Sequence, residues 1–261
     1  MALFFHDDEH VTPGVRKVGF PRYREVLEGN WKEFLLVGFL TLLWYIPLAA
    51  GLVYAILSKS SLVAIGSGIL GGAIAGPGLA CLYDLILRRL RDDKAHWGIC
   101  YKRSLRQNWR ASLLPGIVQH LFLALIVYSE ALVLWGARQF SFGTLALMAL
   151  GGLLLKMLLN VWWCQVVLFD QKLLLRLKNC IFFCLFHPGR ALGAALIQLV
   201  WLAVLFLLLP WSAFAVPVLG IWYTTFLAVF LLYRPMDKDF QIEDQIRQKF
   251  PERLPPEEYR P

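Results

Sequence analysis

The chain alternates between long apolar stretches and shorter polar segments. Six apolar stretches stand out, at 34–57, 62–87, 112–135, 142–169, 191–209 and 213–233. A helix needs about 20 residues to cross about 30 Å of hydrocarbon, and each stretch is close to or above that length. Short loops separate the members of successive pairs, at 58–61, 136–141 and 210–212. The pattern predicts an all-α integral membrane protein with six transmembrane helices arranged as three tandem hairpins.

We expect an amphipathic helix on the inner membrane surface before each hairpin. In the first polar segment, Tyr23, Leu27, Trp31 and Leu35 recur every four residues. This spacing places them on one face of a helix, which is typical of a segment that lies in the membrane interface and leads into a span.

The segment before the second hairpin has the clearest amphipathic pattern. Its apolar stripe consists of Trp97, Tyr101, Leu105, Trp109 and Leu113. Its basic residues are Lys102, Arg103, Arg106 and Arg110. Such a helix can place its tryptophans among lipid headgroups and its cations on anionic lipid. A docking surface for an acidic partner is the alternative interpretation, and the two roles are compatible.

The polar segments also carry an internal repeat. Residues 23–32 (YREVLEGNWK) match 101–110 (YKRSLRQNWR) at an offset of 78. Each unit would enter the membrane from the same side, as in parallel repeats. We therefore expect one six-span membrane domain over 1–233, followed by a cytoplasmic tail at 234–261. Its hairpin units are expected at about 21–87, 97–169 and 176–233.

Charge is distributed unevenly along the chain. Of the 26 Lys and Arg residues, 23 lie in the polar segments 1–33, 88–111, 170–190 and 234–261. Positively charged loops stay on the cytoplasmic side, so we expect both termini in the cytoplasm and the protein in the plasma membrane. The net charge of +8 then favours the anionic inner leaflet as a partner. Binding of nucleic acid is not expected, because a protein that binds nucleic acid needs a basic face in contact with water.

Composition supports a membrane protein. The chain is 58% hydrophobic and 17% charged, with a mean hydropathy of +0.58. A soluble domain has about 45–50% apolar and about 25% charged residues.

The second apolar stretch has small residues at every fourth position. They are Ala64, Gly68, Gly72, Gly76 and Ala80. Small residues on one face allow membrane helices to approach closely, so this face is predicted to pack against another helix. The pattern does not say whether that helix belongs to the same chain.

Four polar residues lie within predicted spans, namely His120, Glu130, Lys156 and Asn160. His120 and Lys156 fall at matching depth on consecutive antiparallel spans, whereas Glu130 is close to the outer headgroups. Ionisable groups at such depth usually face the interior of a helix bundle. Structural hydrogen bonds and snorkelling are the simpler interpretation. A polar cluster of His120, Lys156 and Asn160, for solute binding or helix registration, is the alternative.

Motifs for catalysis are missing from the sequence. We find no HExxH, GxSxG or Walker motif and no paired carboxylates in an apolar stretch. His6 and His10 flank acidic residues, but no further ligands cluster near them, which favours a solvated tail over a metal site. We expect no cofactor, no metal and no enzymatic activity.

Residues 29–118 resemble the YesL-like family of small bacterial membrane proteins, a domain family of unknown function. The matching segments are GNWK at 29–32, WYIP at 44–47, GPGLACLYD at 76–84, RDD at 91–93 and NWRA at 108–111. The resemblance implies a multispanning helical fold and a frequent gene neighbourhood with carbohydrate ABC importers and glycan-degrading enzymes. It implies no catalytic or binding residues.

Three functions follow as hypotheses. The first is an accessory subunit or regulator of a bacterial carbohydrate ABC importer, which would contact permease subunits through its small-residue spans and basic inner face. The second is a self-contained small-solute channel or transporter, with His120 and Lys156 lining a polar path. The third is a structural, lipid-binding membrane protein.

Overall fold

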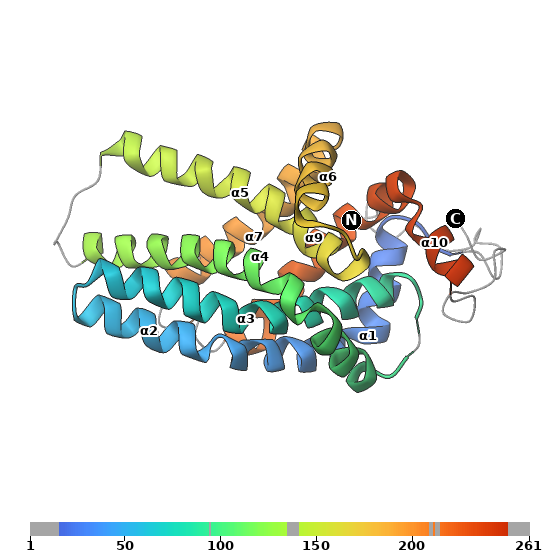
Figure 1. Ribbon diagram of the computed structural model, residues 1–261, viewed down its shortest axis with the longest axis horizontal. Helices are drawn as coiled ribbons and strands as arrows, with labels where there is room; N and C mark the ends of the chain where they lie inside the picture. Colours follow the sequence, from blue (N-terminus) through green and yellow to red (C-terminus); the bar gives the residue numbers. More distant parts are fainter. Residues whose placement is uncertain (1–15, 94, 135–140, 209–210, 212–214, 250–261) are drawn as a thin grey trace, which may run out of the picture.

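The computed structural model describes residues 16–93, 95–134, 141–208, 211 and 215–249. Within these ranges the chain forms helices and turns and no strand. The elements are α1 (Phe20–Trp44), α2 (Ile46–Leu57), α3 (Ser61–Leu90), α4 (Trp97–Leu134), α5 (Phe142–Leu168), α6 (Leu173–Phe186), α7 (Pro188–Leu207), the π-helical stretch η1 (Val216–Gly220), α9 (Trp222–Phe240) and α10 (Ile242–Lys249). α2, α3, α4 and α5 run along the long axis of the molecule (Figure 1).

Five helical segments are long and apolar enough to cross a membrane. They are Ser61–Leu90, Trp97–Val133, Ala146–Leu168, Pro188–Leu205 and Val218–Phe240. α1 and α2 meet the same criteria together, with a bend of 44° between them, and would make a sixth span. The prediction of an all-helical protein with several helices able to span a membrane is therefore confirmed for the described residues.

The bend between α1 and α2 falls at Tyr45, two residues before Pro47. Proline has no backbone N–H to donate and restricts the residue before it, so it interrupts a helix that would otherwise continue. At the start of α2 the same proline is tolerated, because an N–H in the first turn has no partner inside the helix. The first predicted span is thus two helices rather than one.

The predicted surface helices of the first two units are not separate elements. α1 includes the first amphipathic segment and continues into the span, and α4 does the same from Trp97 to Leu134. No proline or glycine stands at 33–34 or at 111–112, so the helical hydrogen bonds continue across both predicted boundaries. The first turns of α4 nevertheless point away from the direction of the rest of the helix (Figure 1).

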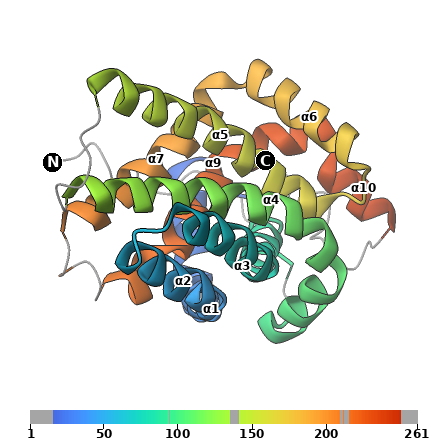
Figure 2. The ribbon, with the colours of Figure 1, turned by 60° about the vertical axis from the view of Figure 1, so that its left-hand side comes forward.

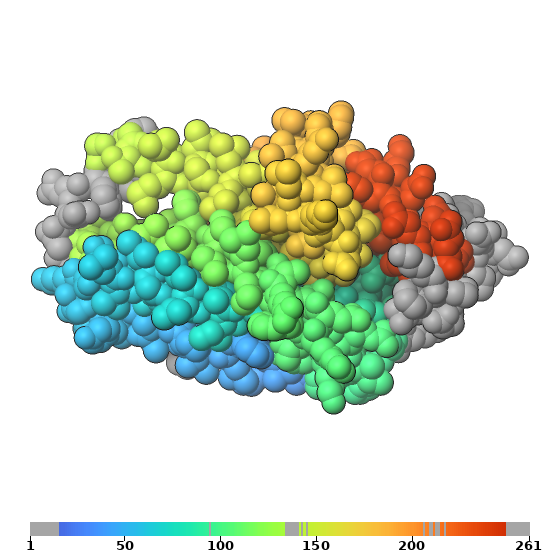
Figure 3. All heavy atoms as spheres, viewed as in Figure 1, coloured from blue at the N-terminus to red at the C-terminus, as the bar shows by residue number. Residues whose placement is uncertain are grey.

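The third surface segment is a helix of its own. α6 stands across the direction of α3 and α4 (Figure 1) and lies at the surface in the space-filling view (Figure 3). It exposes large apolar side chains, with Leu174 81% and Phe186 73% exposed. Its Arg176 is buried and donates to the backbone carbonyls of Phe169 and Gln171. A short helix with this exposed apolar face is suited to the membrane interface.

α3 lies between α2 and α4, as both views show (Figures 1 and 2), and its contact with α4 is the most extensive in the fold. A Cβ atom added at Gly72 would lie 2.7 Å from the carbonyl oxygen of Gly116, and one at Gly76 would lie 2.6 Å from that of Ser112. The two backbones therefore touch, which only small residues allow. The small-residue face of α3 packs within the chain, against α4.

Aromatic side chains join the first, second and third hairpins in one core. The rings of Phe34 on α1 and Phe226 on α9 lie 5.2 Å apart, and those of Tyr83 on α3 and Trp163 on α5 lie 5.9 Å apart. All four side chains are almost completely buried. Large aromatic residues contribute much of the packing energy of a core, so these pairs hold the hairpins together.

Both described ends of the chain lie at the same end of the bundle (Figure 1). α9 continues to Phe240, beyond the expected last residue of the span at Tyr233, and α10 follows with Ile242 and Glu243 buried. The first residues of the predicted tail thus belong to the folded structure.

Of the predicted loops, the turn between Leu57 and Ser61 is present. The loops at 136–141 and 210–212 lie mainly outside the described residues, as do His6, His10 and the chain after Lys249.

Candidate functional site

A partly open cavity of about 430 Å³ lies between the helices of the bundle. Residues of α1, α3, α4, α5, α7, η1 and α9 line it, so every hairpin contributes to its wall. The wall is mainly apolar, with Leu42, Leu79, Phe122, Leu155 and Leu159 among its side chains. Its polar residues are Tyr45, Tyr83, Gln119, Lys156, Gln198, Thr224 and Thr225. A mainly apolar cavity with a few converging polar groups is typical of a small-molecule site, and its volume falls in the usual range.

Lys156 is the charged residue of the described cavity wall. It projects from α5, and its Nζ lies 3.4 Å from Oε1 of Gln119 on α4. The same oxygen accepts a shorter hydrogen bond of 2.8 Å from Trp163 Nε1. The ammonium group therefore shares one neutral acceptor with an indole, and no carboxylate among the described residues pairs with it.

Gln198 on α7 adds a second amide to the cavity wall. Its buried Oε1 has no hydrogen-bond partner among the described residues. The hydroxyls of Thr224 and Thr225 bond to carbonyls of the preceding turn, with Thr225 Oγ1 donating to Ile221 O at 2.7 Å. The threonine hydroxyls thus have hydrogen-bond partners in their own helical turn. Lys156 Nζ and Gln198 Oε1, by contrast, lack a full set of hydrogen-bond partners at the cavity wall.

Asn160 lies deeper in the protein than Lys156 and is completely buried. Its Oδ1 accepts a hydrogen bond of 3.2 Å from the hydroxyl of Tyr83, which lines the cavity. Its Nδ2 has no partner in the described structure. Asn160 therefore supports the cavity wall through Tyr83.

His120 is completely buried between α3 and α4 and does not line the cavity. Its Nδ1 donates to the carbonyl of Gly116 at 2.7 Å, because a carbonyl oxygen can only accept. Its ring meets that of Tyr45 edge-on, with centroids 4.8 Å apart. Glu130 lies further along α4 and is half-buried. No hydrogen bond within the described residues joins His120, Lys156 and Asn160 to one another, and each of the three contacts a different partner.

The basic surface of α4 consists of Lys102, Arg103, Arg106 and Arg110. Three of these are exposed and Arg103 is half-buried, and the described chain provides no ion pair for any of them. Trp109 is 47% exposed with the Arg110 guanidinium 5.3 Å from its ring centroid, whereas Trp97 packs partly on the core. This arrangement leaves a row of cations free to meet an anionic surface.

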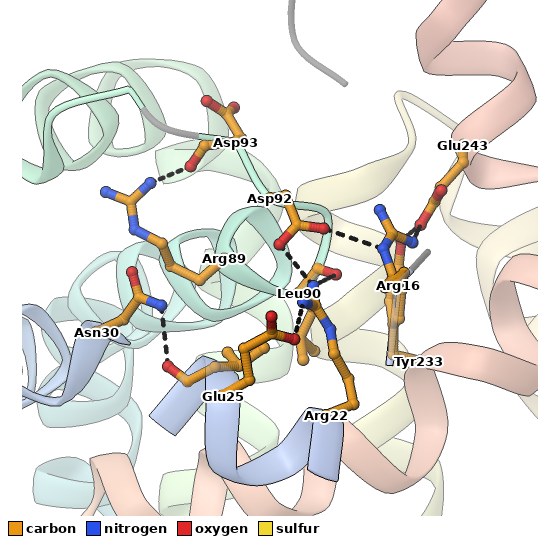
Figure 4. A network of polar contacts seen from close by, with 11 residues as sticks. Arg16, Arg22, Glu25, Asn30, Arg89, Leu90, Asp92, Asp93, Tyr233 and Glu243 are labelled. Carbon is orange, nitrogen blue, oxygen red and sulfur yellow. Dashed lines mark hydrogen bonds and ion pairs between the residues drawn. The ribbon is translucent and has the colours of Figure 1, made fainter. Parts of the chain in front are cut away.

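A network of buried and partly buried ion pairs closes the end of the bundle where Arg16, the first described residue, meets α10 (Figure 4). Arg16 pairs with Asp92 at 2.9 Å and with Glu243 at 2.7 Å, and Arg22 pairs with Asp92 at 2.7 Å. The hydroxyl of Tyr233 donates to Glu243 at 2.6 Å. Burial opposes the charge of Arg16, but the carboxylates of Glu243 and Asp92 outweigh it and raise the pKa of Arg16. The network ties the N-terminal segment, the loop after α3 and α10 together.

Of the seven polar residues of the cavity wall, six were not predicted from the sequence: Tyr45, Tyr83, Gln119, Gln198, Thr224 and Thr225. The search for ionisable residues passed over them because they carry no charge. Uncharged polar residues inside apolar stretches are nevertheless a usable signal, since they too need partners in a membrane. Gln119 directly precedes His120, and Gln198 interrupts an otherwise apolar stretch.

Comparisons with known proteins give no relative for the chain. No family model matches it, and neither a curated protein nor a solved structure is significantly similar. The resemblance to the YesL-like family rests on the sequence segments quoted above.

Proposed function

We propose that this protein is a small-solute transporter of the plasma membrane that holds its solute in the cavity of the helix bundle. The observation that carries the proposal is the meeting of Lys156, Gln119 and Gln198, from three different helices, on the wall of a cavity in the apolar part of the protein. Polar groups in such a position are costly unless they have a partner, and sites on several helices are common in transporters.

Orientation is part of this proposal. We propose that the end of the bundle with the ion network faces the cytoplasm and that both chain termini are cytoplasmic, because 23 of the 26 Lys and Arg residues lie in the polar segments expected on that side. The basic surface of α4 would then lie on the anionic inner leaflet, with Trp109 among the headgroups.

The cavity can be tested by filling it. Leu155 lines the cavity, whereas its neighbour Leu154 does not and is 53% exposed. We expect a small molecule that co-purifies with the wild type in mild detergent to be retained by Leu154→Trp and lost from Leu155→Trp, as read by mass spectrometry. Uptake of that molecule into proteoliposomes should be lost in Lys156→Leu. Equal retention of the molecule by the wild type, Leu154→Trp and Leu155→Trp would contradict the proposal.

An accessory subunit of a carbohydrate ABC importer is a second proposal. The exposed cations of α4, which form no ion pair within the described residues, favour it, because an acidic permease surface could meet them. The small-residue face of α3 does not, because α4 already covers it. The test is a pull-down from native membranes in mild detergent. Near-stoichiometric permease subunits, lost on charge reversal of Arg103, Arg106 and Arg110, would support this role, and a preparation of this chain alone would contradict it.

A further inference from the structure

We infer that the ligand of the cavity is an anionic amphiphile, whose acidic group pairs with Lys156 and whose apolar part fills the remaining space. The inference rests on the proposed function, since it names the chemical class of the molecule that the cavity holds. Fatty acids and anionic phospholipids share this chemistry.

Lys156 requires a partner that the described chain does not supply. An ammonium group has three N–H donors and no acceptor, and burying it unpaired is costly. Gln119 Oε1 offers one long contact of 3.4 Å and is already bonded to Trp163. An acid at the cavity would take up the remaining donors and neutralise the charge.

Snorkelling to the headgroups does not solve the problem for Lys156. The residue stands near the middle of α5, about 18–21 Å along the helix from either end at 1.5 Å per residue. A lysine side chain is much shorter than this distance. The ammonium group therefore remains within the apolar part of the protein and faces the cavity that it lines.

The rest of the cavity fits the same class of ligand. None of its described lining residues is acidic, so a cationic ligand would find no counter-charge. The amides of Gln119 and Gln198 add polar groups to the same cavity wall. The wall beyond them is built from apolar side chains such as Leu79, Phe122 and Leu159, which suit an alkyl chain or a ring system.

Two fluorescent probes with the same body separate charge recognition from apolar binding. 1-Anilinonaphthalene-8-sulfonate carries one anionic group, and N-phenyl-1-naphthylamine is its neutral parent. We would titrate each into the full-length protein in nanodiscs of zwitterionic phosphatidylcholine. Leu155→Trp, with its filled cavity, gives the background from lipid. Lys156→Gln removes the charge and Lys156→Arg keeps it, and thermal unfolding confirms that each variant is folded.

We expect the wild type to bind both probes above the Leu155→Trp background. Lys156→Gln should weaken binding of the sulfonate probe on the order of tenfold, as expected for the loss of a hydrogen bond to a charged group. Binding of the neutral probe should stay unchanged. Lys156→Arg should retain the sulfonate. Displacement by oleate or by phosphatidylglycerol then distinguishes a free acid from a phospholipid as the source of the acid.

Several outcomes would overturn the inference. Equal binding of both probes to the wild type and Lys156→Gln would show that the lysine recognises no anion, while the cavity itself would stand. If neither oleate nor phosphatidylglycerol displaced the sulfonate probe, the ligand would not be an anionic amphiphile. Failure of both probes to exceed the background in the wild type would remove the proposed function as well.

Discussion

Arg16 Nη1 lies 2.7 Å from Glu243 Oε1, so an ion pair joins the start of the described chain to its last helix, 227 residues later. Glu243 is 2% exposed and also accepts from Tyr233. A buried pair of this kind contributes little net stability when intact, but breaking it leaves an uncompensated charge. Its importance therefore appears when one partner is removed.

We predict that Glu243→Ala destabilises the protein by about 3 kcal/mol, because Arg16 then remains buried with Asp92 alone. The measurement is the free energy of unfolding in mild detergent. The matched control is Glu28→Ala, which breaks an exposed pair with Arg24 on α1 and should change stability by less than about 0.5 kcal/mol. Equal effects of the two substitutions would contradict the structural role of the buried network.

Close contact between α3 and α4 gives a second prediction. Gly76→Ala would place a Cβ atom 2.6 Å from the carbonyl oxygen of Ser112, so we expect a loss of about 1–3 kcal/mol as the helices move apart. Gly66→Ala on the same helix meets no atom within 4 Å and should be neutral or slightly stabilising. Unfolding of both variants, measured side by side, tests this. Tolerance of alanine at Gly76 would mean that the two backbones are further apart.

Asp93, in the loop after α3, should make the stability of the protein depend on pH. Burial alone would raise the pKa of Asp93, but hydrogen bonds from the Ala95 N–H and from Arg88 outweigh it and hold the pKa below its ordinary value. A lowered pKa in the folded state means that Asp93 stabilises the protein above its unfolded pKa of about 3.9. That contribution is lost as the pH falls below this value.

The check is the unfolding temperature between about pH 6 and about pH 3. Asp93→Asn should be less stable than the wild type at the upper end, and the difference should shrink toward the lower end. A constant difference over the whole range would show that Asp93 acts through its shape rather than its charge.

The basic surface of α4 predicts retention of anionic lipid. Replacing Lys102, Arg106 and Arg110 by glutamine should lower the phosphatidylglycerol that co-purifies with the protein, since each cation at the surface contributes about 1 kcal/mol. Lys59→Gln, an exposed cation in the turn between α2 and α3, is the control and should have little effect. Lipid analysis by mass spectrometry gives the result. Unchanged lipid in the triple variant would contradict this role.

Much of the fold followed from the sequence because a bilayer imposes a simple length rule on apolar stretches. The small-residue face from Ala64 to Ala80 was recognised, but its partner was not, because spacing on one helix does not identify the helix that it touches. The continuity of α1 and α4 was missed because a change in polarity was treated as a structural boundary. A helix ends only where its hydrogen bonds are interrupted, as happens before Pro47.

The candidate site was less predictable. Lys156 was identified because a charge in an apolar stretch is conspicuous, but Gln119 and Gln198, which line the same cavity, come from other helices. His120 was grouped with Lys156 because their depths match, whereas rotation about the helix axis turns the histidine toward Tyr45 and α3. Depth along a helix can be estimated from residue number, but facing direction depends on packing.

The wall of the cavity has a consequence for how the protein is made. A ribosome delivers the chain from its N-terminus, so α3, α4 and α5 enter the membrane before α7 and α9 exist. Gln198, Thr224 and Thr225 come from these last helices, and the cavity is incomplete until they arrive. Binding of the proposed ligand would therefore report that synthesis and assembly have finished, and a bound molecule would stabilise only the completed protein.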